Sequence, residues 1–325
     1  MNGMARFDLF LVAACTAWFP GAIPAADYPG RPIRFVVPYV PSGAADIVAR
    51  VIAQKLGDAL GATVVVDNRA GAGGNLGTDL VAKAAPDGYT LLMGNVGPLA
   101  INASLFKRLP YDPLKDLAPV SFMAVYPNVL VVNPSLPAKS VSELIALAKA
   151  RPGQLSYASA GTGSSTHLAA ELFRSMAAID MAHVPYKGGG QAVVDVMAGQ
   201  VQLYFSSMLG ALPHVKSGKL RALAVTSGRR SRAAPELPTV SESGFRGYEA
   251  SNWVGLLVPA GTPAPIILRL NREIVRIFEQ PDVQERLSAQ GGEAETGSPE
   301  KFAAYIRAEI KKWAKVVKDS GAQVE

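Results

Sequence analysis

The amino-acid sequence predicts an α/β fold in which mainly parallel sheets are flanked by helices. The chain has 325 residues, and at about 150 residues per domain this length fits roughly two domains. Apolar residues make up 49% of the chain and charged residues 18%, which is ordinary for a globular protein. Short apolar runs alternate with segments of helical periodicity along most of the sequence, a pattern typical of parallel strands covered by helices.

The first third of the chain contains three predicted strands and two predicted helices. Residues 33–37 (IRFVV) form a short apolar, β-branched run that predicts a strand. After the turn at Pro41-Ser42-Gly43, apolar side chains recur on one helical face, which predicts a helix over residues 44–60. Glycine-rich and proline-rich turns separate the remaining elements, which are strand 63–67, helix 75–84 and strand 90–93.

The same alternation continues to the C-terminus. We expect further strands at residues 129–132, 155–158, 181–184, 202–205, 220–225 and 253–258. We expect further helices at residues 141–150, 165–176, 190–197, 209–215, 265–278, 282–290 and 299–318. The Pro-rich stretch 109–119 and the Gly-rich stretch 244–247 are candidate crossings of the chain between two lobes.

Residues 1–26 have the layout of a secretory signal peptide. A short polar start with one arginine precedes the apolar run 9–19, which is too short for a bilayer span of about 20 residues. Small residues follow, and we expect cleavage near Ala25 or Ala26. The only cysteine, Cys15, lies inside this segment. A lipid anchor at Cys15 is an alternative, but the apolar run before it is short, so we favour simple export.

Several function classes lack the residues that they need. A single cysteine excludes a disulfide framework or a cysteine-ligated metal site within the chain. The three histidines, at positions 167, 183 and 214, do not follow ligand spacing, so we expect no metal. The net charge of +6 is mild. The basic cluster at 229–232 lacks interleaved aromatic residues, and the lysines at 311, 312, 315 and 318 fit the solvated face of a terminal helix. We therefore expect no nucleic-acid partner.

Two glycine-containing segments come close to known motifs without matching them. A hydrolase nucleophile elbow needs Gly-x-Ser-x-Gly, and residues 161–165 (GTGSS) are out of register. Residues 71–77 (GAGGNLG) follow a predicted strand, but the dinucleotide fingerprint requires glycine where Leu76 stands. We interpret this loop as a tight strand-to-helix turn and expect no cofactor.

Two strand–helix junctions, residues 37–46 and 156–167, combine small residues with hydroxyl groups. The first N–H groups of a helix have no partner within it, and the helix dipole adds about 0.3–1 kcal/mol for an anion there. A pair of such junctions could hold a carboxylate between two lobes. The alternative is that both are ordinary capped helix starts, because Ser and Thr are favoured N-caps. The residues alone leave both interpretations open.

At this point a family resemblance can be identified from seven motifs. They are Tyr28-Pro29 with 31–33 (RPI), 65–77 (VVDNRAGAGGNLG), 82–92 (AKAAPDGYTLL), 155–167 (LSYASAGTGSSTH), 184–190 (VPYKGGG), 237–240 (LPTV) and 259–263 (PAGTP). From about residue 28 to its C-terminus, the chain resembles the substrate-binding receptors of tripartite tricarboxylate transporters, also called Bug-type extracytoplasmic solute receptors.

The resemblance implies a two-lobed periplasmic binding protein of type II, which closes on its ligand like a Venus flytrap. Lobe 1 would comprise residues 27–125 plus 248–325, with a C-terminal helix able to contact both lobes, and lobe 2 would comprise residues 126–247. The ligands implied are small carboxylates: di- and tricarboxylates, acidic amino acids and aromatic acids. In the family, the first strand–helix loop of each lobe holds a carboxylate, partly through two ordered waters.

Carried over to this chain, the resemblance predicts a set of ligand-binding residues on the two junctions and on neighbouring strand ends. They are Tyr39, Ser42, Gly43, Ala44, Asp46, Asn95, Gly97, Ser159, Ala160, Gly161, Thr162, Gly163, Ser164, His167, Tyr186, Ser206 and Ser207. Relatives usually carry two adjacent glycines where Ser42-Gly43 stands here, so this loop can differ in fine ligand preference.

The predicted function is a non-enzymatic periplasmic receptor for a small carboxylate, acting as a monomer without a cofactor. It would deliver its ligand to the membrane subunits of a tripartite tricarboxylate-type transporter. One alternative is a receptor that serves a sensor protein and has no transporter of its own. Another is a secreted hydrolase that uses Ser164 and His167.

Overall fold

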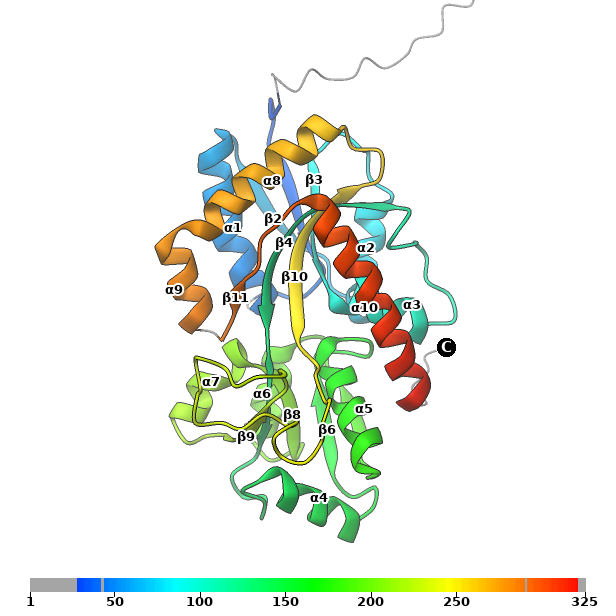
Figure 1. Cartoon of the computed structure of the whole chain (residues 1–325), viewed down its shortest axis with the longest axis vertical. Helices are drawn as coiled ribbons and strands as arrows, with labels where there is room; N and C mark the ends of the chain where they lie inside the picture. The colour runs from blue at the N-terminus through cyan, green and yellow to red at the C-terminus, as the bar shows by residue number, and fades with distance from the viewer. Residues whose placement is uncertain (1–27, 42–43, 290, 321–325) are drawn as a thin grey trace, which may run out of the picture.

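The computed structural model describes residues 28–41, 44–289 and 291–320. The predicted signal peptide with Cys15, and the loop residues Ser42 and Gly43, lie outside the described residues. Within the described ranges, no helix is long and apolar enough to cross a membrane. Figure 1 shows two lobes stacked along the longest axis, each built on one sheet with helices against its faces.

The first sheet contains six strands in the order β11-β4-β10-β3-β1-β2. The strands are β1 (Ile33–Val37), β2 (Val64–Asn68), β3 (Thr90–Asn95), β4 (Leu117–Tyr126), β10 (Asn252–Pro259) and β11 (Glu293–Ala294). The helices are α1 (Ala44–Leu60), α2 (Asn75–Ala82), α3 (Asn102–Leu105), α8 (Ala264–Glu279), α9 (Pro281–Ala289) and α10 (Pro299–Ser320). A 3₁₀ turn (Ala72–Gly74) precedes α2, and a π-helix (Gly97–Ile101) follows β3.

The second sheet contains five strands in the order β7-β6-β8-β5-β9. The strands are β5 (Asn128–Val132), β6 (Ser156–Ser159), β7 (Ala182–Pro185), β8 (Leu203–Ser207) and β9 (Arg221–Val225). The helices of this lobe are α4 (Val141–Ala150), α5 (Ser165–Ala177), α6 (Gly189–Met197) and α7 (Met208–Lys216).

Both sheets are mixed, which corrects the expectation of mainly parallel pairing. In the second sheet β6 pairs in parallel with β7 and β8, whereas β5 is antiparallel to β8 and β9. In the first sheet β10 is antiparallel to both β3 and β4. The strands β5 and β10 are the ones that enter from the other lobe. A strand entering at the edge where the lobes meet starts beside the carboxyl ends of its neighbours, so it must run in the opposite direction.

The chain passes between the sheets at Pro127 and at Ser251. Pro127 separates β4 from β5. Ser251 directly precedes β10, and Ala250 before it donates its N–H to the carbonyl of Thr226, which follows β9. The Pro-rich stretch 109–119 is therefore not a crossing, because Leu117 already begins β4 of the first sheet.

Core packing joins the lobes along one side of the molecule. One apolar cluster contains Val36 and Leu92 of the first sheet, Phe205 of the second, Phe173 of α5 and Trp313 of α10. Because this cluster spans both sheets, α10 packs against both lobes, as Figure 1 shows where its end approaches α5. The other face of each sheet has its own core, with α1 and α8 covering the first and α6 and α7 the second.

Candidate functional site

The carboxyl ends of the parallel strands in the two lobes face one cavity of about 80 Å³. One water needs roughly 10–15 Å³ by this measure, so the cavity has room for a small polar ligand. The described residues that line it are Tyr39, Val40, Ala45, Asn95, Asn128, Ala160, Ser164, Ser165, Thr166, Gly188, Gly189, Tyr204, Ser207 and Asn252. None of these carries a charge, so recognition of an anion here depends on hydrogen bonds and on helix dipoles.

The structure divides the predicted site residues into three groups. Those that line the cavity are Tyr39, Asn95, Ala160, Ser164 and Ser207. Those that line a larger outer groove of about 570 Å³ are Gly161, Thr162 and Tyr186, with Tyr39 and Ala160 in both walls. Those that line neither are Asp46, Gly97, Ser159, Gly163, His167 and Ser206; Ala44 begins α1.

Ser164 caps helix α5 at the edge of the cavity. Its backbone is extended (φ −73°, ψ 160°), and its Oγ accepts a hydrogen bond from the N–H of His167 at 3.3 Å. The same hydroxyl donates to the Gly161 carbonyl at 2.6 Å. The N–H groups of Ser165 and Thr166 follow in the first helical turn, where they have no carbonyl partner within the helix. Both residues line the cavity, so these N–H groups are available to donate to an anion there.

The loop before α5 uses its own N–H groups internally. Ala160 N–H donates to Thr166 Oγ1 at 2.9 Å, and Gly161 N–H donates to Ser159 Oγ at 3.2 Å. Gly163 N–H donates to His167 Nδ1 at 3.3 Å. These three N–H groups therefore shape the loop that forms the cavity wall. Ser165 and Thr166, which also line the cavity, were not among the predicted site residues, although recognising Ser164 as the cap would have indicated them.

Two stacked histidines lie behind the α5 loop. The rings of His167 and His183 are 4.2 Å apart between centroids, and His183 Nε2 is 2.7 Å from Ser159 Oγ. Burial is the main cause that lowers the pKa of His167 to about 3 and that of His183 to about 4. Both rings are therefore neutral at neutral pH and position the loop without adding positive charge to the site.

In the first lobe, Asp46 has a structural role in the first turn of α1. It is buried, and its carboxylate accepts hydrogen bonds from Arg50 Nε at 2.9 Å and from Asn68 Nδ2 at 3.0 Å. Asn68 Nδ2 also donates to the Tyr39 carbonyl at 3.0 Å. Asp46 thereby ties α1 to the end of β2 and holds the backbone of the β1–α1 junction beside the cavity.

Tyr39 and Asn95 form the polar wall that the first lobe contributes. Asn95 Nδ2 donates to the Tyr39 hydroxyl at 2.8 Å, and that hydroxyl also lies 3.3 Å from the Gly73 carbonyl. Burial raises the pKa of Tyr39 to about 12 despite the hydrogen bond with Asn95. The phenol is therefore neutral across the physiological range.

The lobes touch through glycines on either side of this wall. Gly73 has φ +64°, and a methyl group there would lie 2.2 Å from the Thr162 carbonyl oxygen of the second lobe. A methyl group on Gly97 would lie 2.8 Å from the Gly163 carbonyl oxygen. Because real side chains do not approach so closely, glycine at these two positions allows the lobes to close.

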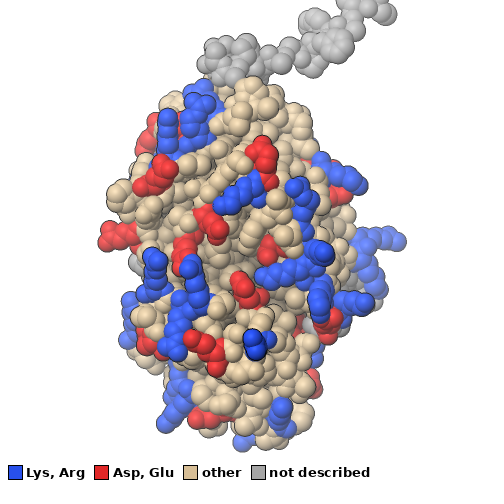
Figure 2. All heavy atoms as spheres, viewed as in Figure 1, with Lys and Arg blue, Asp and Glu red and all other residues tan. Residues whose placement is uncertain are grey.

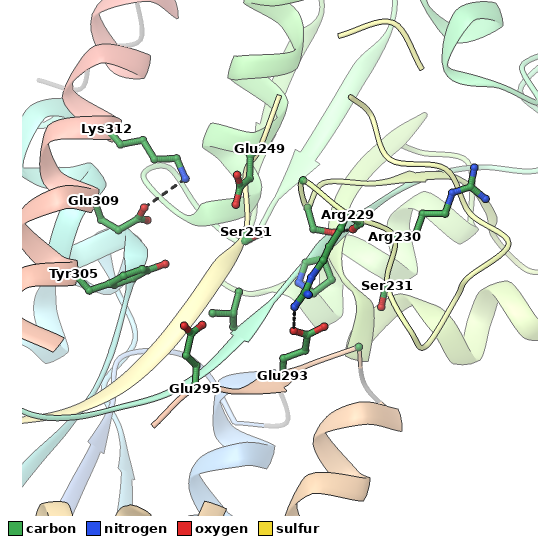
Figure 3. Close-up of a pocket in the computed structure, with 15 residues that line it drawn as sticks. Arg229, Arg230, Ser231, Glu249, Ser251, Glu293, Glu295, Tyr305, Glu309 and Lys312 are labelled. Carbon is green, nitrogen blue, oxygen red and sulfur yellow. Dashed lines mark hydrogen bonds and ion pairs between the residues drawn. The ribbon is translucent and has the colours of Figure 1, made fainter. Parts of the chain in front are cut away.

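A third space, the outer hollow of about 550 Å³, lies on the outer side of the strands that cross between the lobes (Figure 3). An ion pair between Arg229 of the second lobe and Glu293 of β11 spans it. Glu309 of α10 accepts from the indole N–H of Trp253 at 2.9 Å and lies 3.4 Å from Lys312 Nζ. Figure 2 shows basic and acidic side chains interspersed over this face of the molecule.

Metal ligation has no candidate site in the described ranges, where no group of three or more His, Cys, Asp or Glu residues could hold an ion. Strand alternation separates the outer hollow from the cavity between the lobes. Val125, Pro127 and Ser251 line the outer hollow, whereas Asn128 and Asn252 line the cavity between the lobes.

Comparison with known proteins places the site in a family. Residues 48–322 match the tripartite tricarboxylate transporter family receptor. The chain is 45% identical to protein BugT of Bordetella pertussis over 328 residues, which covers all of both chains. It is also similar to two solved structures of Rhodopseudomonas palustris proteins.

The first of these structures is Rpa4515 with adipate, at 37% identity and a TM-score of 0.89, with 92% of this chain and 100% of that one covered. The second is MatC with bound malate, at 33% identity and a TM-score of 0.86, with 89% and 100% covered. Both the sequence match and the shared two-lobed architecture lead to one conclusion. The chain belongs to the tripartite tricarboxylate transporter receptor family, the Bug-type solute receptors.

Proposed function

We propose that the protein is a periplasmic receptor that captures a small carboxylate between its lobes and delivers it to a tripartite tricarboxylate-type transporter. The observation that carries this proposal is the uncharged cavity between the lobes, into which the first turn of α5 presents Ser165 and Thr166. The family consists of periplasmic solute receptors, and residues 1–26 would supply the export signal. The relatives bound to adipate and malate support a di- or hydroxycarboxylate as ligand.

The contacts proposed for the carboxylate can supply most of the binding free energy that uptake requires. A hydrogen bond to a charged group contributes about 1.5–3 kcal/mol, and a partly buried helix N-terminus adds up to about 2 kcal/mol. Two N–H donors and one dipole therefore approach the roughly 8 kcal/mol of a micromolar dissociation constant, before contacts of the first lobe are added. Contacts on both lobes favour the closed arrangement, because only that arrangement allows both sets to form.

The proposal assigns a binding role and no catalytic one. Ser164 Oγ is engaged as a helix cap and as a donor to Gly161, so it is not placed as a nucleophile. His167 Nδ1 accepts from Gly163 N–H, which keeps this nitrogen from serving as a base for Ser164. The hydrolase alternative therefore lacks its activated pair. A receptor that serves a sensor would use the same cavity and differs only in its partner.

A thermal-shift series tests the proposal. Small carboxylates, including adipate and malate, are compared with the neutral amide of each acid. A ligand at about 100 times its dissociation constant should stabilise the protein by roughly 2.7 kcal/mol. The acid should stabilise and its fully neutral amide should not. Equal stabilisation by acid and amide, or stabilisation by none of the acids, would show that the cavity is not a carboxylate site.

A further inference from the structure

The floor of the cavity, where the chain crosses between the lobes, is built from two pairs of strand neighbours. Asn128 of β5 pairs with Ser207 of β8, and Asn252 of β10 pairs with Tyr126 of β4. Asn128, Ser207 and Asn252 line the main cavity. Tyr126 lines a small annex of about 20 Å³, which shares Ser207 and Asn252 with the main cavity. The annex has room for about one water-sized group.

Two polar atoms of this floor have no hydrogen-bond partner among the described residues: Asn128 Oδ1 and the Tyr126 hydroxyl. Asn128 is fully buried and Tyr126 is 7% exposed. Leaving a buried polar atom without a partner is costly, so such atoms usually have a partner in the functional state. The neighbouring Ser207 Oγ and Asn252 Oδ1 accept from Gly210 N–H and Trp253 N–H, and no described donor lies within hydrogen-bond distance of Asn128 Oδ1.

The orientation of the Asn128 amide is fixed by its other end. Nδ2 donates to the Ala250 carbonyl at 3.3 Å, and a flipped amide would place its oxygen against that carbonyl instead. The backbone of Asn128 is held as well, because its N–H donates to Thr226 Oγ1 at 2.8 Å and its carbonyl accepts from Thr226 N–H at 2.9 Å. Oδ1 is therefore a fixed acceptor, and a group that pairs with it must be a hydrogen-bond donor.

We propose that Asn128 determines ligand specificity by accepting a hydrogen bond from a donor at the ligand end remote from the carboxylate held by α5. This inference rests on the proposed function and narrows its ligand class to carboxylates with a hydroxyl, ammonium or amide N–H at that end. A second ionised carboxylate is disfavoured at Asn128, because it offers no donor to the unpartnered Oδ1. The Tyr126 hydroxyl lines the annex that adjoins the cavity at Ser207 and Asn252, so a ligand end that extends into the annex can also accept from it.

Calorimetric titration of the full chain with matched acids tests the inference. The probes, each taken at several chain lengths, differ only at the far end: a methyl group, a hydroxyl, an amide or a second carboxylate. Hexanoate, 5-hydroxypentanoate, adipamate and adipate form one such set. At the best length, the hydroxyl or amide acid should bind roughly tenfold more tightly than the methyl acid, the usual effect of one hydrogen bond. Equal affinities for all four ends at every length would overturn the inference.

Substitutions of the floor residues test which atom causes the preference for a hydrogen-bond donor at the far end of the acid. Asn128→Leu should abolish the preference for the hydroxyl acid and leave the affinity for the methyl acid within about twofold. Tyr126→Phe, which removes only the hydroxyl, should reduce the preference and leave the fold intact. If Asn128→Leu does not fold, Asn128→Asp replaces it and should shift the preference toward an ammonium end such as that of 5-aminopentanoate.

The outcomes separate this inference from the proposed function. If Asn128→Leu weakens all four acids equally, or Asn128→Asp shows no gain for the ammonium acid, Asn128 has only a structural role and the inference is wrong. In both cases carboxylate binding by the wild type still stands. If the wild type binds none of the acids, the proposed function fails and the inference fails with it.

Discussion

Replacing Gly97 by alanine should prevent the lobes from closing while leaving each lobe folded. Gly97 begins the π-helix that follows β3 in the first lobe, and a methyl group on it would come within 2.8 Å of the Gly163 carbonyl oxygen in the second lobe. The backbone of Gly97 is outside the left-handed region, so alanine can adopt it without strain. The other near atoms, Tyr39 Oη and Gly73 O, are at 3.5 Å. The one severe conflict is therefore between the lobes.

The size of the effect follows from that distance. Contacts of a Cβ atom under 3.0 Å are essentially never observed, and the obstructing atom here is a backbone oxygen that cannot rotate away. Overpacking of this kind typically costs about 1–3 kcal/mol. The cost applies to the closed arrangement alone, since separation of the lobes relieves it. If ligand binding requires closure, its affinity should fall by about 5- to 150-fold.

Calorimetric titration with the acid that gives the largest thermal shift measures this loss. The matched control is Gly190→Ala in α6, where the same methyl group meets no atom within 4 Å and the backbone is equally permissive. The control should bind as the wild type does, and both variants should unfold near the wild-type temperature without ligand. Wild-type affinity in Gly97→Ala would refute the link between closure and binding, as would an equal loss in both variants.

Three other predictions concern acid stability, the hinge and the α5 cap. Burial lowers the pKa of His183 from 6.5 to about 4, so the folded state binds fewer protons than the unfolded chain in this window. The free energy of unfolding should therefore be highest above about pH 6.5 and decrease as the pH falls toward 4. Urea titrations at several pH values should show a smaller decrease for His183→Gln than for the wild type, and equal decreases would contradict this. Glu293→Gln removes an exposed ion pair with Arg229, worth less than about 1 kcal/mol, so ligand affinity should change by less than about fivefold and the difference should vanish in 1 M salt; a larger effect would mean that this pair controls closure. Ser164→Ala should lower the free energy of unfolding by about 1–2 kcal/mol and weaken binding, whereas Ser140→Ala at the α4 cap should lower stability alone; equal binding by the two variants would remove Ser164 from the site.

Helical periodicity in the sequence predicted the positions of most helices well. The proline content of one segment led us to expect a connection where the structure has a strand. Residues 44–60 and 141–150 are helices with the predicted bounds. The long strand β4 was missed, because Pro119 suggested a connection. In the structure Pro119 is opposite Leu257, at an irregularity in the β4–β10 register. A proline is tolerated where the ladder is already interrupted, and sequence alone does not show where that interruption lies.

The site shows a similar limit at the level of single hydrogen bonds. The small residues of the 156–167 junction indicated a helix start that could receive an anion, and the structure places a capped helix there. Which N–H groups are free depends on side chains that fold back onto the loop. The side chains of Ser159, Thr166 and His167 each accept a hydrogen bond from one N–H of the loop before α5. No spacing rule predicts these contacts, because they require the final positions of β6, β7 and α5.

The strands that cross between the lobes contribute both to ligand recognition and to the movement of the lobes. Along these strands Tyr126, Asn128 and Asn252 face the space between the lobes, and the residues that alternate with them, such as Pro127 and Ser251, face the outer hollow. A change in the angle between the lobes must bend the chain at these positions, which widens one space as it narrows the other. Changes on the inner side should therefore alter which ligand binds, whereas changes on the outer side should alter how readily the lobes close for every ligand.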